Sequence, residues 1–213
     1  ETQRNAMRHL SSLRLYATGR HMVLDAAARR NLELTQTLRR GTGKGTLLSL
    51  LDRTTTAMGA RLLGAWVEQP LSQKEPIEER LEAVAALKAS PVLMESLRDA
   101  LKDVRDIERI VGRISYNTLN ARHCLALAQS FGATPAVITL IAQAPARMLR
   151  EIHDSLDPMD DIADLIGRMI DPDAPLSLAD GGVIREGFCE ELDALKRAAS
   201  EGKQWLAEME ARE

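Results

Sequence analysis

The segment at residues 41–46 is the part of the chain whose residue types come nearest to phosphate chemistry. It reads GTGKGT, and a lysine among glycines is typical of loops that hold phosphates. A Walker A loop, however, places four residues between its first glycine and a Gly-Lys-Ser/Thr sequence, and it follows a strand. Here Gly45 follows Lys44, and the preceding residues 32–38 favour a helix. We therefore interpret the segment as a flexible connection.

The other reactive side chains form no recognisable catalytic or metal-binding pattern. No histidine stands at metal-ligand spacing from another or from a cysteine; these residues are His9, His21, His123, His153, Cys124 and Cys189. Three aspartates, Asp160, Asp161 and Asp164, lie where a helix is expected to begin, and carboxylates there interact favourably with the helix macrodipole. No Ser, His and Asp arrangement forms a nucleophile elbow. We expect no catalytic, cofactor-binding or metal-binding residue in this chain.

Composition favours a helical protein of the reducing cytoplasm. The chain has 213 residues, of which 45% are apolar but only 3% aromatic, so Leu, Ala, Ile and Met must carry the packing. Two distant cysteines do not make a disulfide framework. No apolar run reaches the length of a membrane span and no signal peptide opens the chain. We expect a soluble, cytoplasmic protein with no membrane contact, and Glu1 in place of Met fits an internal piece of a longer chain.

Basic residues gather in the first 44 positions, although the net charge of the whole chain is −3. Nine of these positions are Arg or Lys, against Glu1, Asp25 and Glu33. A solvated face is the favoured interpretation, and a phosphate-facing patch is the alternative. The alternative requires the arginines to share one surface, and overall charge predicts weak or no DNA binding by the isolated chain.

Turn and capping residues divide the chain into short helices. Residues 13–16 and 21–24 are the only strand candidates, and they predict a small β-hairpin. Helix starts are expected at the capping or first-turn residues Asp25, Thr46, Ser72, Pro91, Asp103 or Asp106, Asn120, Pro135 and Asp157-Pro158, with ends at Pro70 and Pro145. Residues 171–175 and 180–182 predict loops. The expected fold is all-α: a multi-helix bundle with a small N-terminal β-hairpin and a long protruding C-terminal lever helix.

The last 27 residues, 187–213, predict one long helix with a narrow apolar stripe. We define the apolar stripe as Phe188, Leu192, Leu195, Ala199, Leu206 and Met209, which with Gly202 follow a strict four-three spacing. That spacing is the heptad pattern that packs against one partner helix. Because the stripe continues to the end of the chain, we expect a truncated arm whose partner lies elsewhere. Gly202 costs about 1 kcal/mol relative to Ala, and permits either close helix approach or bending.

Four segments in order along nearly the whole chain resemble the MutS family of DNA mismatch-repair ATPases. They are HMVLDAAARRNLEL at 21–34; TLLSLLDRT at 46–54 continuing as TAMGARLL at 56–63 to Trp66 and Pro70-Leu71; DIERI at 106–110; and DGGVIREG at 180–187 with ELD at 191–193. The resemblance is to the central core and lever region of that family. It implies a core helical domain over residues 1–186 and an outgoing lever helix over 187–213, truncated before the clamp.

The resemblance also implies what this chain lacks. The family's mismatch-reading Phe-x-Glu motif, its clamp and its ATPase lie outside this region, so no catalytic, nucleotide-binding or base-reading residue is carried over. ATP and Mg are expected only in the ATPase domain of the parent. Through that intact parent, the implied partners are mismatched double-stranded DNA, a second subunit in a homodimer and a MutL-like repair protein.

Two functions remain open from the sequence. The favoured one is a non-catalytic core and lever module that couples mismatched-DNA binding to a distant ATPase in the intact parent. The alternative is a free-standing helical protein-protein interaction module that uses the apolar stripe. An enzyme is the third and least favoured interpretation of this chain.

Overall fold

The computed structural model describes residues 18–39 and 41–210, and side chains within 19–39 and 41–202. The elements within these ranges are η1 Thr18–Arg20, α1 Ala26–Asn31, α2 Leu47–Leu51, α3 Ala57–Glu68, α4 Lys74–Ala89, α5 Pro91–Leu101, α6 Ile107–Ser115, α7 Ala121–Ile141, α8 Arg147–Ser155, α9 Asp160–Met169, η2 Leu178–Asp180 and α10 Glu190–Glu210. No strand occurs in this described part, only two isolated antiparallel bridges. The predicted all-α class is confirmed.

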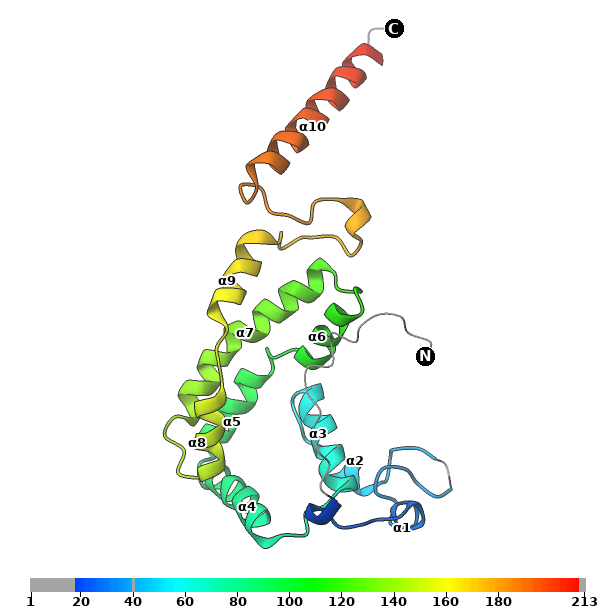
Figure 1. Ribbon diagram of the computed structural model, residues 1–213, viewed down its shortest axis with the longest axis vertical. Coiled ribbons are helices and arrows are strands. Elements are labelled where there is room, and N and C mark those ends of the chain that lie inside the picture. The colour runs from blue at the N-terminus through cyan, green and yellow to red at the C-terminus, as the bar shows by residue number, and fades with distance from the viewer. Residues whose placement is uncertain (1–17, 40, 211–213) are drawn as a thin grey trace.

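The long helix α7 is the centre of the bundle, and it packs against α5, α6, α8 and α9. One core surrounds Ile110, Leu127, Ile166 and Ile170, and joins α6, α7 and α9. A second, smaller core contains Ala83 and Leu149 and joins α4 to α8. Figure 1 shows these helices as an elongated body, with α1 to α3 at one end and α10 extending from the other. By length and composition α7 would also fit a membrane span, but here it is the helix on which four others pack.

Most helices begin where a side chain caps the first turn. The Asp25 carboxylate accepts from Ala28 N at 2.6 Å, and Thr46 Oγ1 accepts from Ser49 N at 3.2 Å. Asp106 caps α6, and Pro91 occupies the first turn of α5, as the sequence predicts. Asn120 forms a reciprocal capping box with His123 at the start of α7. Local chemistry therefore sets the boundaries of these elements.

Two predicted helix starts are wrong. Ser72 does not cap α4; its hydroxyl donates instead to Gly19 O, and α4 begins at Lys74 without a side-chain cap. Pro135 lies inside α7 and does not start a helix. Its ring removes one backbone hydrogen bond, at a cost of about 3 kcal/mol, but α7 packs on four neighbouring helices. Ile141, beyond the proline, is 3% exposed, so tertiary burial keeps the helix continuous.

The predicted N-terminal hairpin is not formed by the residues that the structure describes. Its first strand, residues 13–16, lies outside the described residues. Its turn contains the 3-10 helix η1, and His21 pairs with Leu71 in an isolated antiparallel bridge. Met22 N donates to Pro70 O at 2.8 Å, and Ser72 N donates to Arg20 O at 3.1 Å. Residues 20–22 therefore pair with the segment after α3.

Candidate functional site: the joints of the bundle and the C-terminal arm

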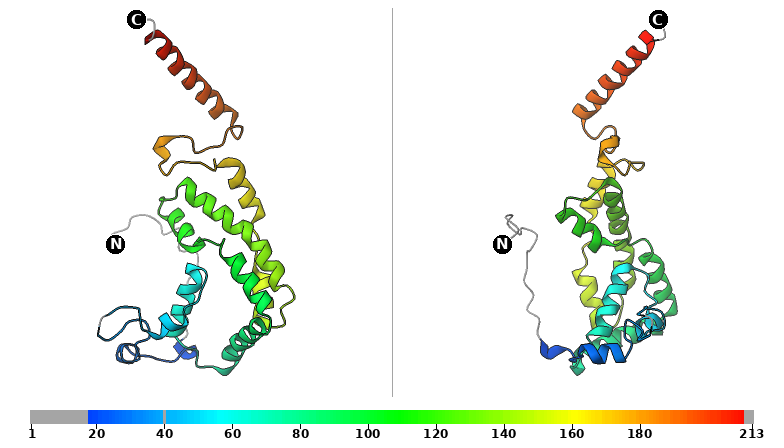
Figure 2. Two further views of the ribbon diagram at one scale, coloured as in Figure 1. Left: turned by 180° about the vertical axis from the view of Figure 1, so that it is seen from behind. Right: turned by 90° about the vertical axis from the view of Figure 1, so that its right-hand side faces the viewer.

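The C-terminal arm begins later than the sequence predicts, because α10 starts at Glu190 and not at Gly187. Phe188 precedes the helix, in a turn where its N–H donates to Arg185 O. At about 1.5 Å per residue, the 21 residues of α10 span about 31 Å. Figure 2 shows from two sides that α10 extends away from the other helices. The division into a 1–186 core and a 187–213 arm stays a prediction.

The described part of the apolar stripe is largely open to solvent. Leu195 is 64% exposed and Phe188 is 41% exposed, Ala199 is exposed, and Leu192 is half-buried. Leu206 and Met209 lie on α10 by its backbone, and their side chains are outside the described ones. Exposed large apolar side chains on one stripe are typical of an interaction surface. The packing role of the stripe remains a prediction. The exposure of its described residues leaves this surface accessible to a partner.

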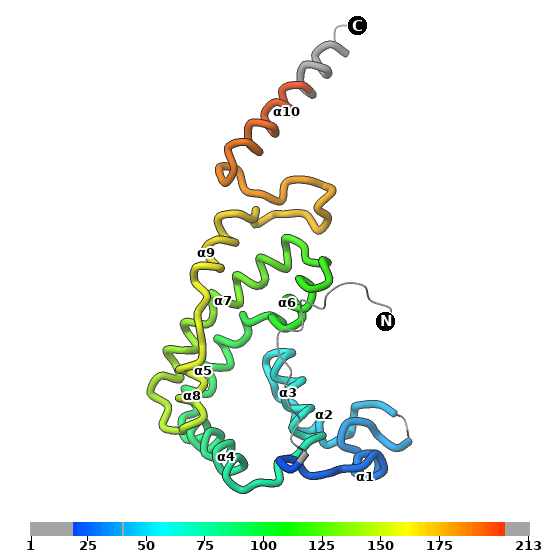
Figure 3. The backbone as a smooth tube through the Cα atoms, in the orientation of Figure 1, coloured from blue at the N-terminus to red at the C-terminus, as the bar shows by residue number. Residues whose placement is uncertain are grey.

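A connection of residues 170–189, here called the junction, joins α9 to α10 (Figure 3). Its two arms run antiparallel at Ile170 and Ile184. Asp171 N donates to Val183 O at 2.9 Å, and Arg185 N donates to Met169 O at 2.9 Å. These backbone bonds attach the residues that lead into α10 to the end of α9. The base of the arm is thus joined directly to the main core.

Side chains of α10 bind back to the junction. Asp193 Oδ2 accepts from Gly187 N at 2.8 Å, and Lys196 Nζ donates to Ile184 O at 2.9 Å. Gly187 has φ +85°, a conformation that glycine adopts without the cost other residues incur. Glu190, Glu191 and Asp193 lie in the first turn, where negative charge favours the helix dipole. The first two turns of α10 are therefore fixed to the junction, and the rest extends outward.

A second joint, here called the arginine clamp, links α3 to α6 through Arg61, Asp106 and Glu108. Arg61 donates to both Asp106 oxygens at 2.8 and 2.6 Å, and to Glu108 Oε2 from Nε at 3.0 Å and from Nη2 at 2.6 Å. Hydrogen bonds from Arg61 lower the pKa of Asp106 to about 2, and the two carboxylates raise the pKa of Arg61. Such a fork fixes orientation as well as proximity.

Two further contacts hold α3 and the segment before it to the bundle. The Arg80 guanidinium of α4 lies 3.6 Å from the ring centroid of Trp66 on α3. Burial of this guanidinium lowers the pKa of Arg80. Arg98 of α5 donates to Arg53 O at 2.8 Å, just before α3. Polar and cation–π contacts, more than a shared apolar core, therefore hold the N-terminal helices in place.

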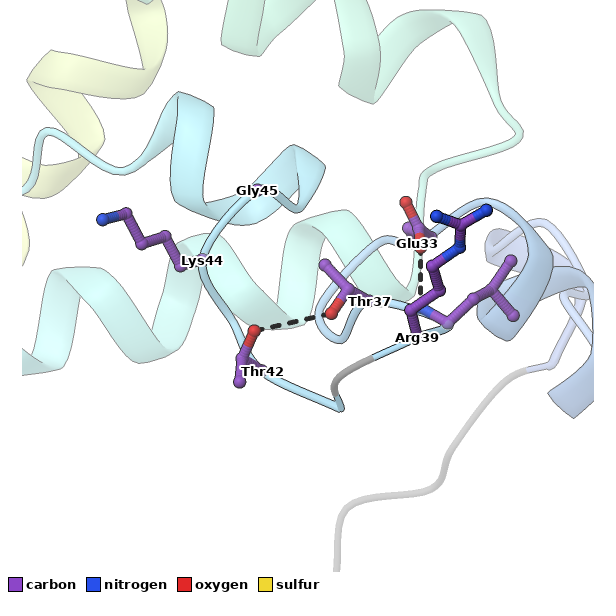
Figure 4. A pocket seen from close by; sticks show the side chains of 7 residues that line it. Glu33, Thr37, Arg39, Thr42, Lys44 and Gly45 are labelled. Atoms are coloured by element: carbon purple, nitrogen blue, oxygen red, sulfur yellow. Dashed lines mark hydrogen bonds between the residues drawn. The ribbon is translucent and has the colours of Figure 1, made fainter.

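The loop between α1 and α2 is organised by its own hydrogen bonds. Thr37 N donates to Thr42 O, Gly41 N to Thr37 O, Thr46 N to Gly43 O and Gly45 N to the Ser49 hydroxyl. Amides committed in this way do not face a phosphate as those of a Walker loop do. A cavity of about 670 Å³ nevertheless opens beside this loop, lined by Glu33, Thr37, Arg39, Thr42 and Lys44 among others (Figure 4).

A family model described as MutS domain III matches residues 27–212. The chain belongs to the MutS domain III family. Over its whole length it is 43% identical to the DNA mismatch repair protein MutS of Lachnoclostridium phytofermentans, and 46% and 44% identical to the proteins of the same name from Symbiobacterium thermophilum and Pelotomaculum thermopropionicum. It covers 23%, 24% and 25% of these three relatives, so it spans about a quarter of their length.

The family resemblance predicted from the sequence is confirmed, and the segments that carried it contain the contacts that join the helices of this chain. Arg61, from the second segment, clamps Asp106 and Glu108 of the third. The first and second meet where Leu48 N donates to Leu34 O at 3.0 Å. The fourth contains the junction bond between Gly187 and Asp193. Sequence reasoning found these segments but not their contacts, because the partners of the clamp are 45 and 47 residues apart.

Proposed function

We propose that this chain is the non-catalytic core and lever module of a MutS-like DNA mismatch-repair protein. In the intact parent it would couple mismatched-DNA binding to a distant ATPase. The observation that supports this most is α10, an arm fixed at its base by the junction and carrying an exposed apolar stripe, in a chain of the MutS domain III family. A packed helix moves nearly as a rigid body, so it transmits a displacement that a flexible loop would absorb.

The chemistry of repair belongs, in this proposal, to other parts of the parent. ATP and Mg would bind in its ATPase domain, which makes the parent a DNA-dependent ATPase and leaves this module without enzymatic activity. Mismatched duplex DNA, a second parent subunit and a MutL-like repair protein would be its partners in the cytoplasm. Within the part of the chain that the structure describes, no group of three His, Cys, Asp or Glu residues is placed to hold a metal ion.

The test uses the full-length parent with Leu195→Asp. This residue is 64% exposed here, so the substitution leaves the module folded and alters only what the stripe contacts. Ala194→Asp is the matched control, because the neighbouring exposed position lies off the stripe on the same helix. We expect Leu195→Asp to slow ATP-triggered release from mismatched DNA, with binding and basal ATP hydrolysis retained, and the control to behave as wild type. Equal release by both variants would refute coupling through α10.

The same exposed stripe also supports the alternative, a helical module that binds another protein or a second copy through α10. Sedimentation of the 213-residue chain at several concentrations separates the two. A tight dimer that Leu195→Asp dissociates, in a parent whose ATP-triggered release is unchanged by the same substitution, would favour the alternative.

A further inference from the structure

The segment 26–45 carries an excess of positive charge that the proposed coupling role does not require. It contains five basic residues and one acidic residue, although the net charge of the chain is −3. Four of the basic residues are described and exposed, and we call Arg29, Arg30, Arg39 and Lys44 the basic surface. Concentrating like charge costs free energy through self-repulsion, and a polyanion that binds there relieves it.

Ion pairs among the residues that the structure describes do not compensate the charge of this surface. None of its four cations forms an ion pair with another residue that the structure describes. Glu33 is the single acid in the segment, and its carboxylate already accepts from Leu38 N at 2.6 Å. The Arg29 Nε donates to Leu24 O at 3.1 Å, which orients that guanidinium. The positive charge therefore faces solvent.

The cations line two adjoining hollows. Arg39 and Lys44 line the cavity of about 670 Å³, and Arg29 and Arg30 line another of about 490 Å³. The two hollows share Thr37 and Leu38, so they lie next to each other on the surface. In Figure 4 the pair of hydroxyls from Thr37 and Thr42 lies between Arg39 and Lys44, whose charged ends point away from each other. A spread of charge of this kind fits an extended polyanion better than a single small anion.

We propose that the basic surface binds the phosphate backbone of duplex DNA, independently of base sequence. Arginine, lysine and threonine side chains are common phosphate ligands in protein–DNA complexes. Residues 18–45 contain no Phe, Trp or Tyr, so the platform on which single-stranded bases stack is missing there. The amides of Thr37, Gly41, Gly45 and Thr46 already donate to other groups of the chain, so the proposed contact is assigned to the side chains. This contact goes beyond the coupling role and does not depend on it.

The salt dependence of binding measures the number of phosphates. Each phosphate neutralised on duplex DNA contributes a slope of about −0.9 in log K against log salt. If all four cations engage, the slope is about −3.6, and raising KCl from about 50 to about 200 mM weakens binding about 150-fold. The negative net charge keeps the contact weak, so it is measured at low salt.

The experiment is fluorescence anisotropy of a labelled duplex of about 30 base pairs, titrated with the 213-residue chain at several KCl concentrations. The test variant is Arg39→Glu with Lys44→Glu. The control is Lys88→Glu with Arg113→Glu, which changes the net charge equally at two exposed positions outside the basic surface. Circular dichroism verifies that both variants fold. We expect the test variant to lose binding at least tenfold and the control to lose less than threefold.

Three outcomes overturn the proposal. In the first, the wild-type chain fails to bind the duplex at about 50 mM KCl. In the second, both variants lose affinity equally, which would mean that net charge alone determines binding. In the third, polyglutamate displaces the duplex at equal charge concentration, which would make the surface a site for acidic protein segments. None of these bears on coupling through α10, which is measured by ATP-triggered release from the parent.

Discussion

Ser130 provides a sharp test of how the bundle positions the arginine clamp. It lies on α7 with 0% exposure, and its hydroxyl donates to Ala126 O at 2.8 Å. The same oxygen accepts from Arg105 N at 2.9 Å, in the turn just before Asp106. This one hydroxyl therefore connects the core helix to the start of α6, on which the clamp depends.

Replacing Ser130 by Ala leaves the Arg105 N–H without its partner. The hydrogen bond from Arg105 N is partly buried, and a donor left without its partner there costs about 1 to 3 kcal/mol; the cavity left by one oxygen adds little. With a urea m-value of about 2 kcal/mol per molar, the unfolding midpoint should fall by roughly 0.5 to 1.5 M. The assay is urea denaturation followed by circular dichroism, together with hydrogen exchange of the Arg105 amide, which should accelerate.

The matched control is Thr139→Ala on the same helix. Its hydroxyl also donates to a backbone carbonyl, Pro135 O at 2.9 Å, but Thr139 is exposed, and its hydroxyl accepts from no amide that the structure describes. We expect a change within about 0.5 kcal/mol for it. A Ser130→Ala variant as stable as the control, with the Arg105 amide still protected, would refute this reasoning.

Three further predictions concern the clamp, the base of the arm and the core. The pKa of Asp106 is about 2 in the folded chain, against an ordinary 3.8, so the clamp stabilises the fold above pH 4 and this stabilisation is lost as pH falls through 2. The fluorescence of Trp66, measured in a variant whose other tryptophan is replaced by phenylalanine, should change between these two pH values. The Arg61→Leu substitution should remove that transition. Gly187→Ala should destabilise the start of α10 by about 1 to 2 kcal/mol, because φ is +85° there, and hydrogen exchange of the first turn should accelerate while exchange in α7 stays unchanged. Ile166→Ala should lower unfolding free energy by about 2 to 5 kcal/mol, since Ile166 is 7% exposed in the main core, and a loss under about 1 kcal/mol in urea denaturation would contradict that packing.

Local signals in the sequence predicted the elements wherever local chemistry decides. Asp25, Thr46, Asp106 and Asn120 cap helices because each side chain reaches an amide three residues ahead, a contact that spacing alone specifies. Pro135 misled the prediction because its cost of about 3 kcal/mol is local, while the burial that overrides it comes from other helices. The late start of α10 has the same kind of origin: the bonds between the strand-like arms of the junction hold residues 184–188 out of the helix.

The sequence identified segments that contain residues of the candidate site, but it could not predict the contacts between them. Arg61 and Asp106 each stand in a segment that resembles the MutS family, yet nothing in the spacing joins them across 45 residues. From the sequence, the basic residues of the first 44 positions favour a solvated face, with a phosphate-facing patch as the alternative. The structure places the four cations of the basic surface along two hollows that share Thr37 and Leu38, which only the tertiary structure shows. The heptad spacing identified the residues of the apolar stripe, but it does not specify the partner that packs against them.

The accessibility of residue 195 in the parent tests the central claim most directly. A parent carrying Leu195→Cys, with its other cysteines replaced by serine, would be labelled with a maleimide and compared with Ala194→Cys and with the same pair in the 213-residue chain. Both positions should react rapidly in the chain, where both are exposed. In the parent, position 195 should be protected and position 194 should remain reactive, because another part of the parent covers the stripe. Equal, rapid labelling of both positions in the parent would contradict the assignment of α10 as a packed lever.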